Sequence, residues 1–381
     1  MKVFVCVFIF ACVFLLWHKF AAAETSDPQV SAKGAVLMEQ HSGRVLFGKN
    51  AHERMRIASI TKIMTAILAI ESGKLDEKVP ISKKAAYTEG SSLYLKPGEK
   101  VRLKDLVYGL MMRSGNDAAV AIAEFIGGSV EGFAYLMNEK AAQIGMTDTV
   151  FANPHGLDDH ETMYSTAYDM ALLTRYAMKN PTFQKIWSTK VYRMKDPDGT
   201  GTIVWKNKNK LLTRYPYSTG GKTGYTRMAK RTLVSTAKKE DLHLIAVTLN
   251  DRNDWDDHIN MFNWGFEHFD LVTLVDEGVV EGIKNKFYRG KVYTKKTFLY
   301  PLAEDEKEDI ATTINLYRPP KDRHWKEGKV PSPVGKMFIR LNGDTVGEIP
   351  LYFEQDETEE SGWWDLLKRI FLVTAGVRVN G

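Results

Sequence analysis

One apolar stretch in the first quarter of the chain constrains the fold more than any other feature. From Ser59 to Ser72 almost every side chain is apolar, and Gly73, a residue type that commonly ends helices, follows. A helix that is apolar on nearly all sides belongs inside a protein rather than on its surface. The basic exception is Lys62, one helical turn after Ser59. Because an unpaired ammonium group is costly to bury, the fold has to hold this lysine neutral or paired.

Further helical and strand patterns surround this helix. Apolar residues recur at helical spacing in four segments: 103–112, 117–125, 131–145 and 168–178. Strand patterns occupy a predicted hairpin and three later segments: 33–50, 217–225, 232–237 and 242–250. Because strands from both ends flank a helical middle, we expect an α/β (α+β) fold, in which an antiparallel sheet is flanked by helices and carries a helical subdomain.

The chain, at 381 residues, is long enough for more than one domain. We predict a first domain over residues 24–270 and a small all-β domain over residues 271–353, where short alternating runs are broken by Gly and Pro. Strands of this second domain are expected at 286–293, 298–301, 337–341 and 346–352.

The last segment, residues 354–381, is predicted to be an acidic linker followed by an amphipathic, membrane-associating tail. Residues 354–360 are acidic, and residues 363–373 combine tryptophans and aliphatic side chains with three charges. Such a helix is too short to span a bilayer but suits the membrane interface. The alternative is a helix that docks on the protein's own surface.

The first 23 residues have the features of a signal peptide. Lys2 precedes an apolar run that reaches Leu16, and a small-residue cleavage site ends at Ala23. An uncleaved anchor helix is the alternative, although the run is shorter than the roughly 20 residues that span a bilayer. Both cysteines, Cys6 and Cys12, fall in this segment, so the mature chain is predicted to contain no thiol. The net charge of +5 is small and indicates no nucleic-acid partner.

Ser59 and Lys62 form the first of three short motifs, S-x-x-K. On a helix three residues make nearly one turn, so the hydroxyl and the amine share a face and can act as nucleophile and general base. A plain helix N-cap is the alternative for Ser59. A second copy, Ser235–Lys238, lies in a predicted strand, where a three-residue step places its ends on opposite faces.

The other two motifs offer groups that a carboxylate-ended substrate needs. Ser114-Gly115-Asn116 fits S-x-N at a break between predicted helices, and Lys222-Thr223-Gly224 fits K-T-G on a predicted edge strand. Ser114 can relay a proton and Asn116 can bond a substrate amide, whereas Lys222 and Thr223 can bind a carboxylate. Gly224 allows close backbone approach. A helix-connecting turn and an ordinary edge strand are the structural alternatives.

In this order the three motifs resemble the signature of penicillin-recognising serine enzymes, that is, penicillin-binding proteins and serine β-lactamases. More narrowly, the chain resembles the low-molecular-mass D-alanyl-D-alanine carboxypeptidases, and runs in it are similar to the sporulation-type enzymes of bacilli. The runs 56–68, 108–124 and 217–236 carry this closer similarity, whereas Asn153–Leu157 and Ser165–Asp169 are similar to a loop and a helix start of the carboxypeptidase family.

The resemblance implies roles for the motif residues. Ser59 would attack the carbonyl between two D-alanines, Lys62 would take its proton, and Ser114 would pass a proton to the leaving amine. Lys222 and Thr223 would hold the terminal carboxylate. The backbone N–H groups of Ser59 and Tyr225 would form the oxyanion hole. Asp169 matches an acidic position of the family, for which a helix N-terminal carboxylate is the simpler explanation.

The resemblance also implies partners and a location. The partners would be peptidoglycan stem peptides ending in D-Ala-D-Ala, β-lactams as covalent inhibitors, and the membrane surface through the C-terminal tail. No cofactor and no metal is expected. The enzyme would be exported and attached peripherally to the outer face of the cytoplasmic membrane, with an association with the forespore.

Three alternatives stay open on the sequence. A class A β-lactamase needs a Glu-x-x-Leu-Asn-like segment, and none lies between Asn116 and Lys222. A catalytically inactive penicillin- or peptidoglycan-sensing module would not need the complete motif set. A zinc carboxypeptidase could use one of two polar runs, both expected to be loops: His155, Asp158, Asp159 and His160, or Asp254, Asp256, Asp257 and His258.

Overall fold

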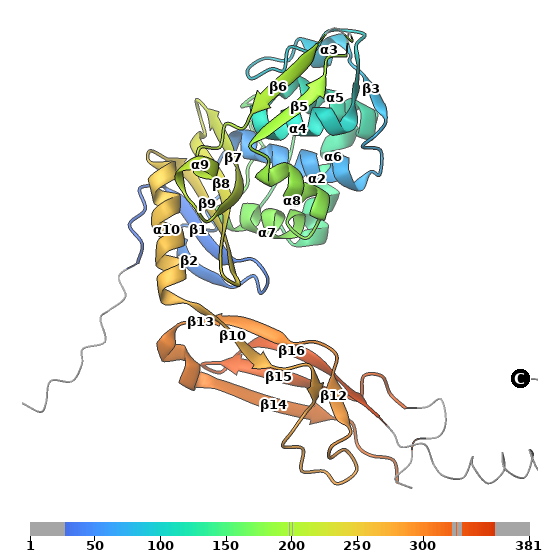
Figure 1. Ribbon diagram of the computed structural model, residues 1–381, viewed down its shortest axis with the longest axis vertical. Helices are drawn as coiled ribbons and strands as arrows, with labels where there is room; N and C mark the ends of the chain where they lie inside the picture. Colours follow the sequence, from blue (N-terminus) through green and yellow to red (C-terminus); the bar gives the residue numbers. More distant parts are fainter. Residues whose placement is uncertain (1–26, 198, 200, 322–324, 326–329, 355–381) are drawn as a thin grey trace, which may run out of the picture. The chain divides into compact units, whose positions relative to one another are not determined.

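The computed structural model describes residues 27–197, 199, 201–321, 325 and 330–354 (Figure 1). The chain divides into two compact units, Met1–Asp270 and Leu271–Gly381, called here the first and the second unit. The predicted signal peptide and the predicted C-terminal tail lie outside the described residues.

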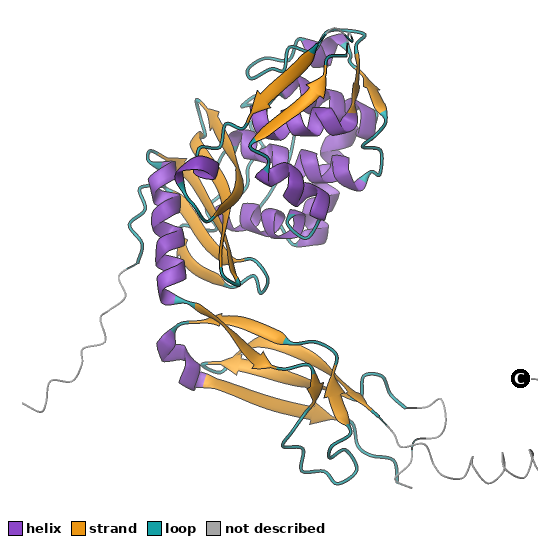
Figure 2. Cartoon of the chain, viewed as in Figure 1, coloured by secondary structure: helices purple, strands orange, loops and turns teal. Residues whose placement is uncertain are grey.

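The first unit is built on a five-stranded antiparallel sheet with the strand order β2-β1-β9-β8-β7. Its strands are β1 (Gly34–Glu39), β2 (Val45–Lys49), β7 (Ser218–Thr226), β8 (Lys230–Lys239) and β9 (Leu242–Asp251). The predicted hairpin and the three predicted strands are therefore confirmed. All six residues of β1 are buried, because helix α10 (Asp254–His268) covers one face of the sheet and helices α7 (Ala167–Ala177) and α8 (Pro181–Ser188) cover the other (Figure 2).

The apolar stretch forms the central helix α2 (Lys62–Glu71) of a helical region. It packs against α4 (Leu103–Arg113), α5 (Asn116–Gly127) and α7, and Ile63, Met64 and Ile67 are fully buried. The predicted helices are confirmed to within a few residues, including α6 (Val130–Ile144), which Ser129 caps by accepting a hydrogen bond from Gly132 N. Short elements complete the unit: α3 (Lys83–Ala86), α9 (Leu211–Arg214) and the antiparallel strand pairs β3–β4 (Lys78–Pro80, Lys100–Arg102) and β5–β6 (Val191–Lys195, Thr202–Lys206).

Besides the short helices α3 and α9, the longer helices α8 and α10 were not expected from the sequence. Asn180 caps α8 by accepting bonds from Thr182 N and Phe183 N. The expectation that the run beginning at Asp254 is a loop is wrong, because it is the first turn of α10. Carboxylates are favoured at a helix N-terminus, and the apolar residues that define the helix, such as Phe262, come later in the segment.

The second unit is all-β, as predicted. A five-stranded sheet has the order β11-β12-β16-β15-β14, and β10 pairs with β13. The strands are β10 (Asp270–Val275), β11 (Gly278–Val279), β12 (Val292–Thr294), β13 (Phe298–Leu302), β14 (Ile310–Leu316), β15 (Gly335–Leu341) and β16 (Asp344–Phe353), with a 3₁₀ helix at Glu304–Asp309. The predicted strand 286–293 is wrong over most of its length, because Asn285 accepts bonds from the backbone of Phe287, Tyr288 and Arg289 and so forms a turn.

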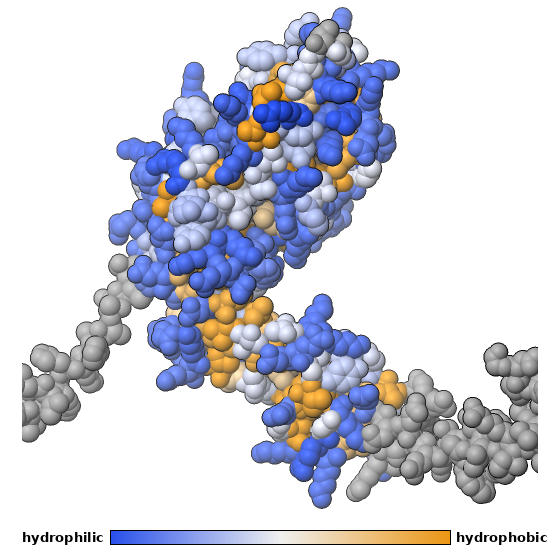
Figure 3. All heavy atoms as spheres, in the orientation of Figure 1, coloured by the Kyte–Doolittle hydropathy of each residue, from blue (hydrophilic) through white to orange (hydrophobic). Residues whose placement is uncertain are grey.

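The visible face of the first unit is mostly polar (Figure 3). Within the described ranges, no single helix has both the length and the apolarity needed to cross a membrane. Helices α5 and α6 meet that criterion only as a pair, and their axes are bent by 82°.

Candidate active site

Ser59 lies on a short 3₁₀ turn, η1 (Ala58–Thr61), directly before α2. The turn is fixed from two directions. Thr61 Oγ1 donates to the Ala58 carbonyl oxygen at 2.7 Å, and Thr232 Oγ1 of β8 donates to the Ile57 carbonyl oxygen at 2.9 Å. Ser59 itself is half-buried, so its hydroxyl is accessible while the backbone around it is held.

Lys62 is fully buried and has three polar neighbours. Its Nζ lies 2.8 Å from Ser59 Oγ, 2.7 Å from Asn116 Oδ1 and 2.8 Å from the His155 carbonyl oxygen. Burial is the main cause of a pKa far below the usual lysine value, and the positive charges of Lys222 and Lys208 lower it further. The predicted proximity of Ser59 and Lys62 is thus observed, with a 3₁₀ turn in place of the first helical turn.

The S-x-N motif lies at the junction of α4 and α5. Ser114 has a left-handed backbone, with a φ of 66°, and its Oγ accepts a bond from Lys222 Nζ at 3.0 Å. Asn116 is buried and uses both ends of its amide, because Oδ1 accepts from Lys62 and Nδ2 donates to the Glu89 carbonyl oxygen at 2.6 Å. In this structure Asn116 therefore holds the lysine and the loop beside it.

The K-T-G motif lies on the edge strand β7. Lys222 is buried, and burial together with the charge of Lys208 lowers its pKa to about 7. A Cβ on Gly224 would lie 2.9 Å from Ser59 N and 2.3 Å from Thr232 Oγ1, so the glycine lets β7 pack against the turn that carries Ser59. Thr223 is half-buried, and Tyr225 is 67% exposed.

The loop Asn153–Leu157 completes the candidate site through contacts with Lys62 and α2 that were not expected from the sequence. The His155 carbonyl oxygen contacts Lys62, and the Pro154 carbonyl oxygen accepts a bond from Thr65 Oγ1 of α2 at 2.6 Å. Asn153 Oδ1 accepts bonds from the backbone N–H groups of His155 and Gly156, which shapes the loop. Gly156 has a φ of 83°, and a Cβ there would lie 1.9 Å from the Ala58 carbonyl oxygen. The sequence shows Gly156 as a possible turn residue, whereas the Ala58 carbonyl group that it packs against is seen only in the structure.

Asp169 does not contact these groups within the described structure. It is buried at the start of α7 and accepts bonds from Asp148 N at 2.9 Å and Thr149 Oγ1 at 2.7 Å. Burial raises its pKa. Its position in the first turn of α7 fits the simpler explanation, a carboxylate at a helix N-terminus, and its two contacts join α7 to the segment after α6.

Comparison with known proteins decides the family. A family model described as D-alanyl-D-alanine carboxypeptidase matches residues 21–253, which is more than half of the chain. The chain belongs to this family, peptidase S11. A second model, the C-terminal domain of penicillin-binding protein 5, matches residues 269–359.

Individual relatives extend the likeness over both units. The carboxypeptidase DacF of Bacillus subtilis is 35% identical over 91% of this chain and 90% of its own length, and DacC of Escherichia coli is 33% identical over 92% of each. The crystal structure of penicillin-binding protein 5 from Haemophilus influenzae aligns with this chain at a TM-score of 0.71 and 27% sequence identity. The alignment covers 87% of this chain and 98% of the other. The family resemblance seen in the sequence is confirmed: the protein is a serine hydrolase, a D-alanyl-D-alanine carboxypeptidase, with the penicillin-recognising α/β fold and a separate C-terminal all-β domain.

Polar side chains from both runs of the zinc alternative form hydrogen bonds with other side chains of the first unit. Asp158 accepts from Thr226 Oγ1 and Asp159 accepts from Asn153 Nδ2. His258 of α10 is buried between Thr248 Oγ1 and Ser235 Oγ, the serine of the second S-x-x-K copy. Across the residues that the structure describes, no three His, Cys, Asp or Glu side chains are grouped to hold a metal ion.

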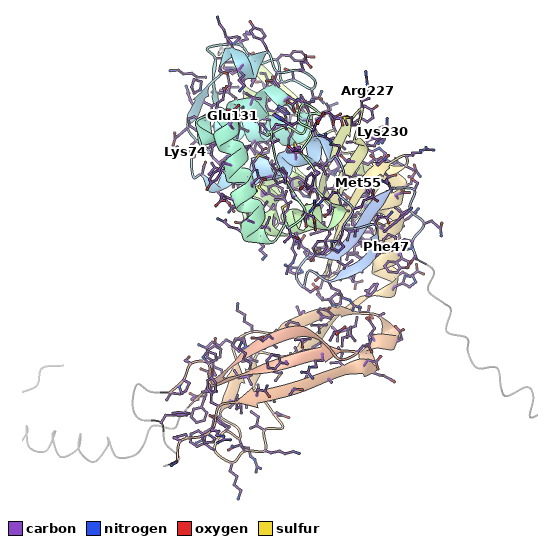
Figure 4. The ribbon with its side chains drawn as sticks, turned by 180° about the vertical axis from the view of Figure 1, so that it is seen from behind. Phe47, Met55, Lys74, Glu131, Arg227 and Lys230 are labelled. Carbon is purple, nitrogen blue, oxygen red and sulfur yellow. The ribbon has the colours of Figure 1, made fainter. Side chains whose placement is uncertain are left out.

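A cavity of about 930 Å³ adjoins the carboxypeptidase site, since His155 and Tyr225 are among its lining residues. Two oppositely charged side chains also line it, Glu131 of α6 and Arg227 just after β7, and both are labelled in Figure 4. The cavity beside His155 and Tyr225 is therefore large enough for a peptide and carries both signs of charge.

Proposed function

We propose that this carboxypeptidase removes the terminal D-alanine from peptidoglycan stem peptides through an acyl-enzyme on Ser59, with Lys62 as the general base. The observation that carries the proposal is the set of contacts around Lys62 Nζ. Asn116 Oδ1 and the His155 carbonyl oxygen can only accept hydrogen bonds, so they take two N–H groups. In a neutral amine, the lone pair is then left for the Ser59 hydroxyl at 2.8 Å.

The electrostatics support the same role for Lys62. Burial and the neighbouring charge of Lys222 both favour the neutral amine, which is the form that a general base needs. As Ser59 attacks the substrate carbonyl, its proton moves to Lys62 Nζ. When the tetrahedral intermediate collapses, the leaving amine needs a proton, and Ser114, bonded to Lys222 Nζ, is suited to pass one on.

The edge strand β7 supplies the remaining groups. We assign the terminal carboxylate of the substrate to Lys222 and Thr223, and the oxyanion to the N–H groups of Ser59 and Tyr225. A Cβ on Gly224 would lie 2.9 Å from Ser59 N, so strand β7 runs directly beside the turn that carries Ser59. This closeness supports the assignment, because the N–H groups of Ser59 and Tyr225 lie on these two neighbouring segments.

Penicillin labelling followed by mass spectrometry tests the proposal. The protein should gain one penicilloyl group on a peptide that contains Ser59, and Ser59→Ala should lose both this adduct and D-alanine release. Ser235→Ala, from the second S-x-x-K copy, is the matched control and should keep the adduct. An adduct on Ser114 or Ser235, or one that persists in Ser59→Ala, would overturn the assignment of the nucleophile.

We further propose that the enzyme is exported and attached peripherally to the outer face of the membrane through residues 363–373, which lie outside the described residues. The amphipathic sequence pattern supports this attachment. A protein that ends at Gly362 should lose binding to lipid vesicles and keep its activity on a small peptide. Unaltered vesicle binding by the truncated protein would contradict the anchor. Association with the forespore stays a prediction that rests on sequence resemblance.

A further inference from the structure

A second cavity, of about 670 Å³, is lined by residues from one end of the first unit's sheet. At this end β1 turns into β2 and β8 turns into β9 (Figure 1). The β1–β2 turn contributes His41, and the β8–β9 hairpin contributes Lys238 and His243. Helix α7 and its C-terminal end contribute Arg175 and Lys179. The residues of the proposed catalytic site do not line this cavity.

The lining is positively charged and contains no carboxylate. Within the described part of the chain, Lys179 and Lys238 have no carboxylate partner. Arg175 is held by two carbonyl oxygens, with Nε donating to Gln40 at 2.9 Å and Nη2 donating to His41 at 2.5 Å. The guanidinium is thus fixed in place without being neutralised.

The carboxylate of Glu39, next to the lining residues Gln40 and His41 in the sequence, does not cancel the positive charge of the cavity lining. Glu39 is fully buried, and its two carboxylate oxygens accept bonds from the backbone N–H groups and side chains of His41 and Ser42. Its oxygens are therefore used in shaping the β1–β2 turn. The neutral side chains of the cavity, Gln184, Ser188 and Thr219, add amide and hydroxyl groups that can donate to an anion.

We propose that this cavity binds a ligand that carries phosphate or phosphodiester groups. Three cations, Arg175 and Lys179 from the C-terminal end of α7 and Lys238 from β8, with hydroxyl and amide donors beside them, match the several oxygens of such a group better than the two oxygens of a single carboxylate. Two sources share this chemistry: a soluble phosphodiester polymer and the headgroups of an anionic phospholipid surface.

Calorimetric titration of the full chain with inorganic pyrophosphate tests the site. Saturable binding with one site per chain is expected, and Lys179→Ala/Lys238→Ala should weaken it about tenfold, since each lysine adds an ion pair. Lys185→Ala/Lys190→Ala is the matched control, because it removes the same charge from exposed positions outside the cavity. The control should change the affinity by less than about twofold. Absence of saturable binding, or equal losses in both double variants, would overturn the proposal.

Competition then distinguishes the two sources. Vesicles of phosphatidylglycerol that displace pyrophosphate from the wild-type protein, while phosphatidylcholine vesicles do not, identify a lipid headgroup. Displacement by soluble poly(glycerol phosphate) without displacement by vesicles identifies a polymer. Penicillin acylation serves as a folding control, and it should be the same in both double variants because neither changes the catalytic groups.

Discussion

The two units of this protein bury different kinds of side chain. The first unit buries two lysines, Lys62 and Lys222, and several carboxylates, including Asp117 and Asp169. Among its described residues, the second unit buries one polar side chain, Thr294, and its core is formed by apolar and aromatic groups such as Val292, Ile339 and Leu351.

The difference shows where function opposes stability. A lysine whose pKa is about 7 in the folded protein, against 10.5 when exposed, disfavours folding at neutral pH by roughly 4–5 kcal/mol. In the window between these two values the unfolded chain binds the additional proton, so this contribution becomes less unfavourable as the pH rises. The second unit has a core without such a cost. We therefore expect substitutions in the first unit's site to change activity, and substitutions in the second unit's core to change stability.

The largest effect is expected for Lys62→Arg. An arginine stays charged near neutral pH and cannot accept the Ser59 proton, so penicillin acylation should fall roughly a thousandfold. Lys74→Arg, at an exposed position just beyond α2, is the matched control and should acylate normally. Acylation at the wild-type rate by folded Lys62→Arg protein, judged by circular dichroism, would exclude Lys62 as the base.

A smaller loss, about a hundredfold in kcat/KM, is expected for Gly156→Ala. The added methyl group would displace the Ala58 carbonyl and with it the turn that carries Ser59, and small displacements of a nucleophile are costly. Gly145→Ala is a close control, because Gly145 has a φ of 84° and open space around its Cβ. Both variants share the backbone strain. If both lose the same activity, strain rather than the contact with Ala58 is the cause.

The pH dependence gives a third test, with a change of about tenfold per pH unit. Lys222 is charged below a pH of about 7 and neutral above it, so kcat/KM for peptides with a free terminal carboxylate should fall as the pH rises past 7. Lys222→Arg keeps the charge, and its profile should lack this descending limb. The same limb in the arginine variant would assign the titration to another group.

The smallest effect on activity is expected in the second unit. Ile339 is fully buried there, and Ile339→Ala should destabilise the protein by about 2–5 kcal/mol, measured by calorimetry. Activity on a soluble D-Ala-D-Ala peptide should stay within about twofold of wild type, because the hydrogen-bond partners of the site residues lie in the first unit. A large loss of activity in the folded variant would break the comparison and show that the second unit supports the site.

Local patterns in the sequence were enough for most of the first unit's elements. The apolar stretch that becomes α2, the helices from α4 to α7 and the strands of the sheet all follow from spacing, because side-chain periodicity is a local property. Local rules failed at α8, at α10 and at residues 286–291. At α10, the carboxylates of the first helical turn look like a polar loop. At residues 286–291, apolar residues in a turn look like a strand.

The sequence by itself determined the three motifs, and with them the family and the chemistry expected of Ser59, Lys62 and Lys222. Only the tertiary structure decided how Lys62 is held and why Gly156 is needed. Lys62 depends on a backbone carbonyl 93 residues away, and any residue type could supply that oxygen. Gly156 is required by the position of Ala58, which packing sets. Side-chain chemistry is written in the sequence, whereas backbone contacts between distant segments exist only once the chain has folded.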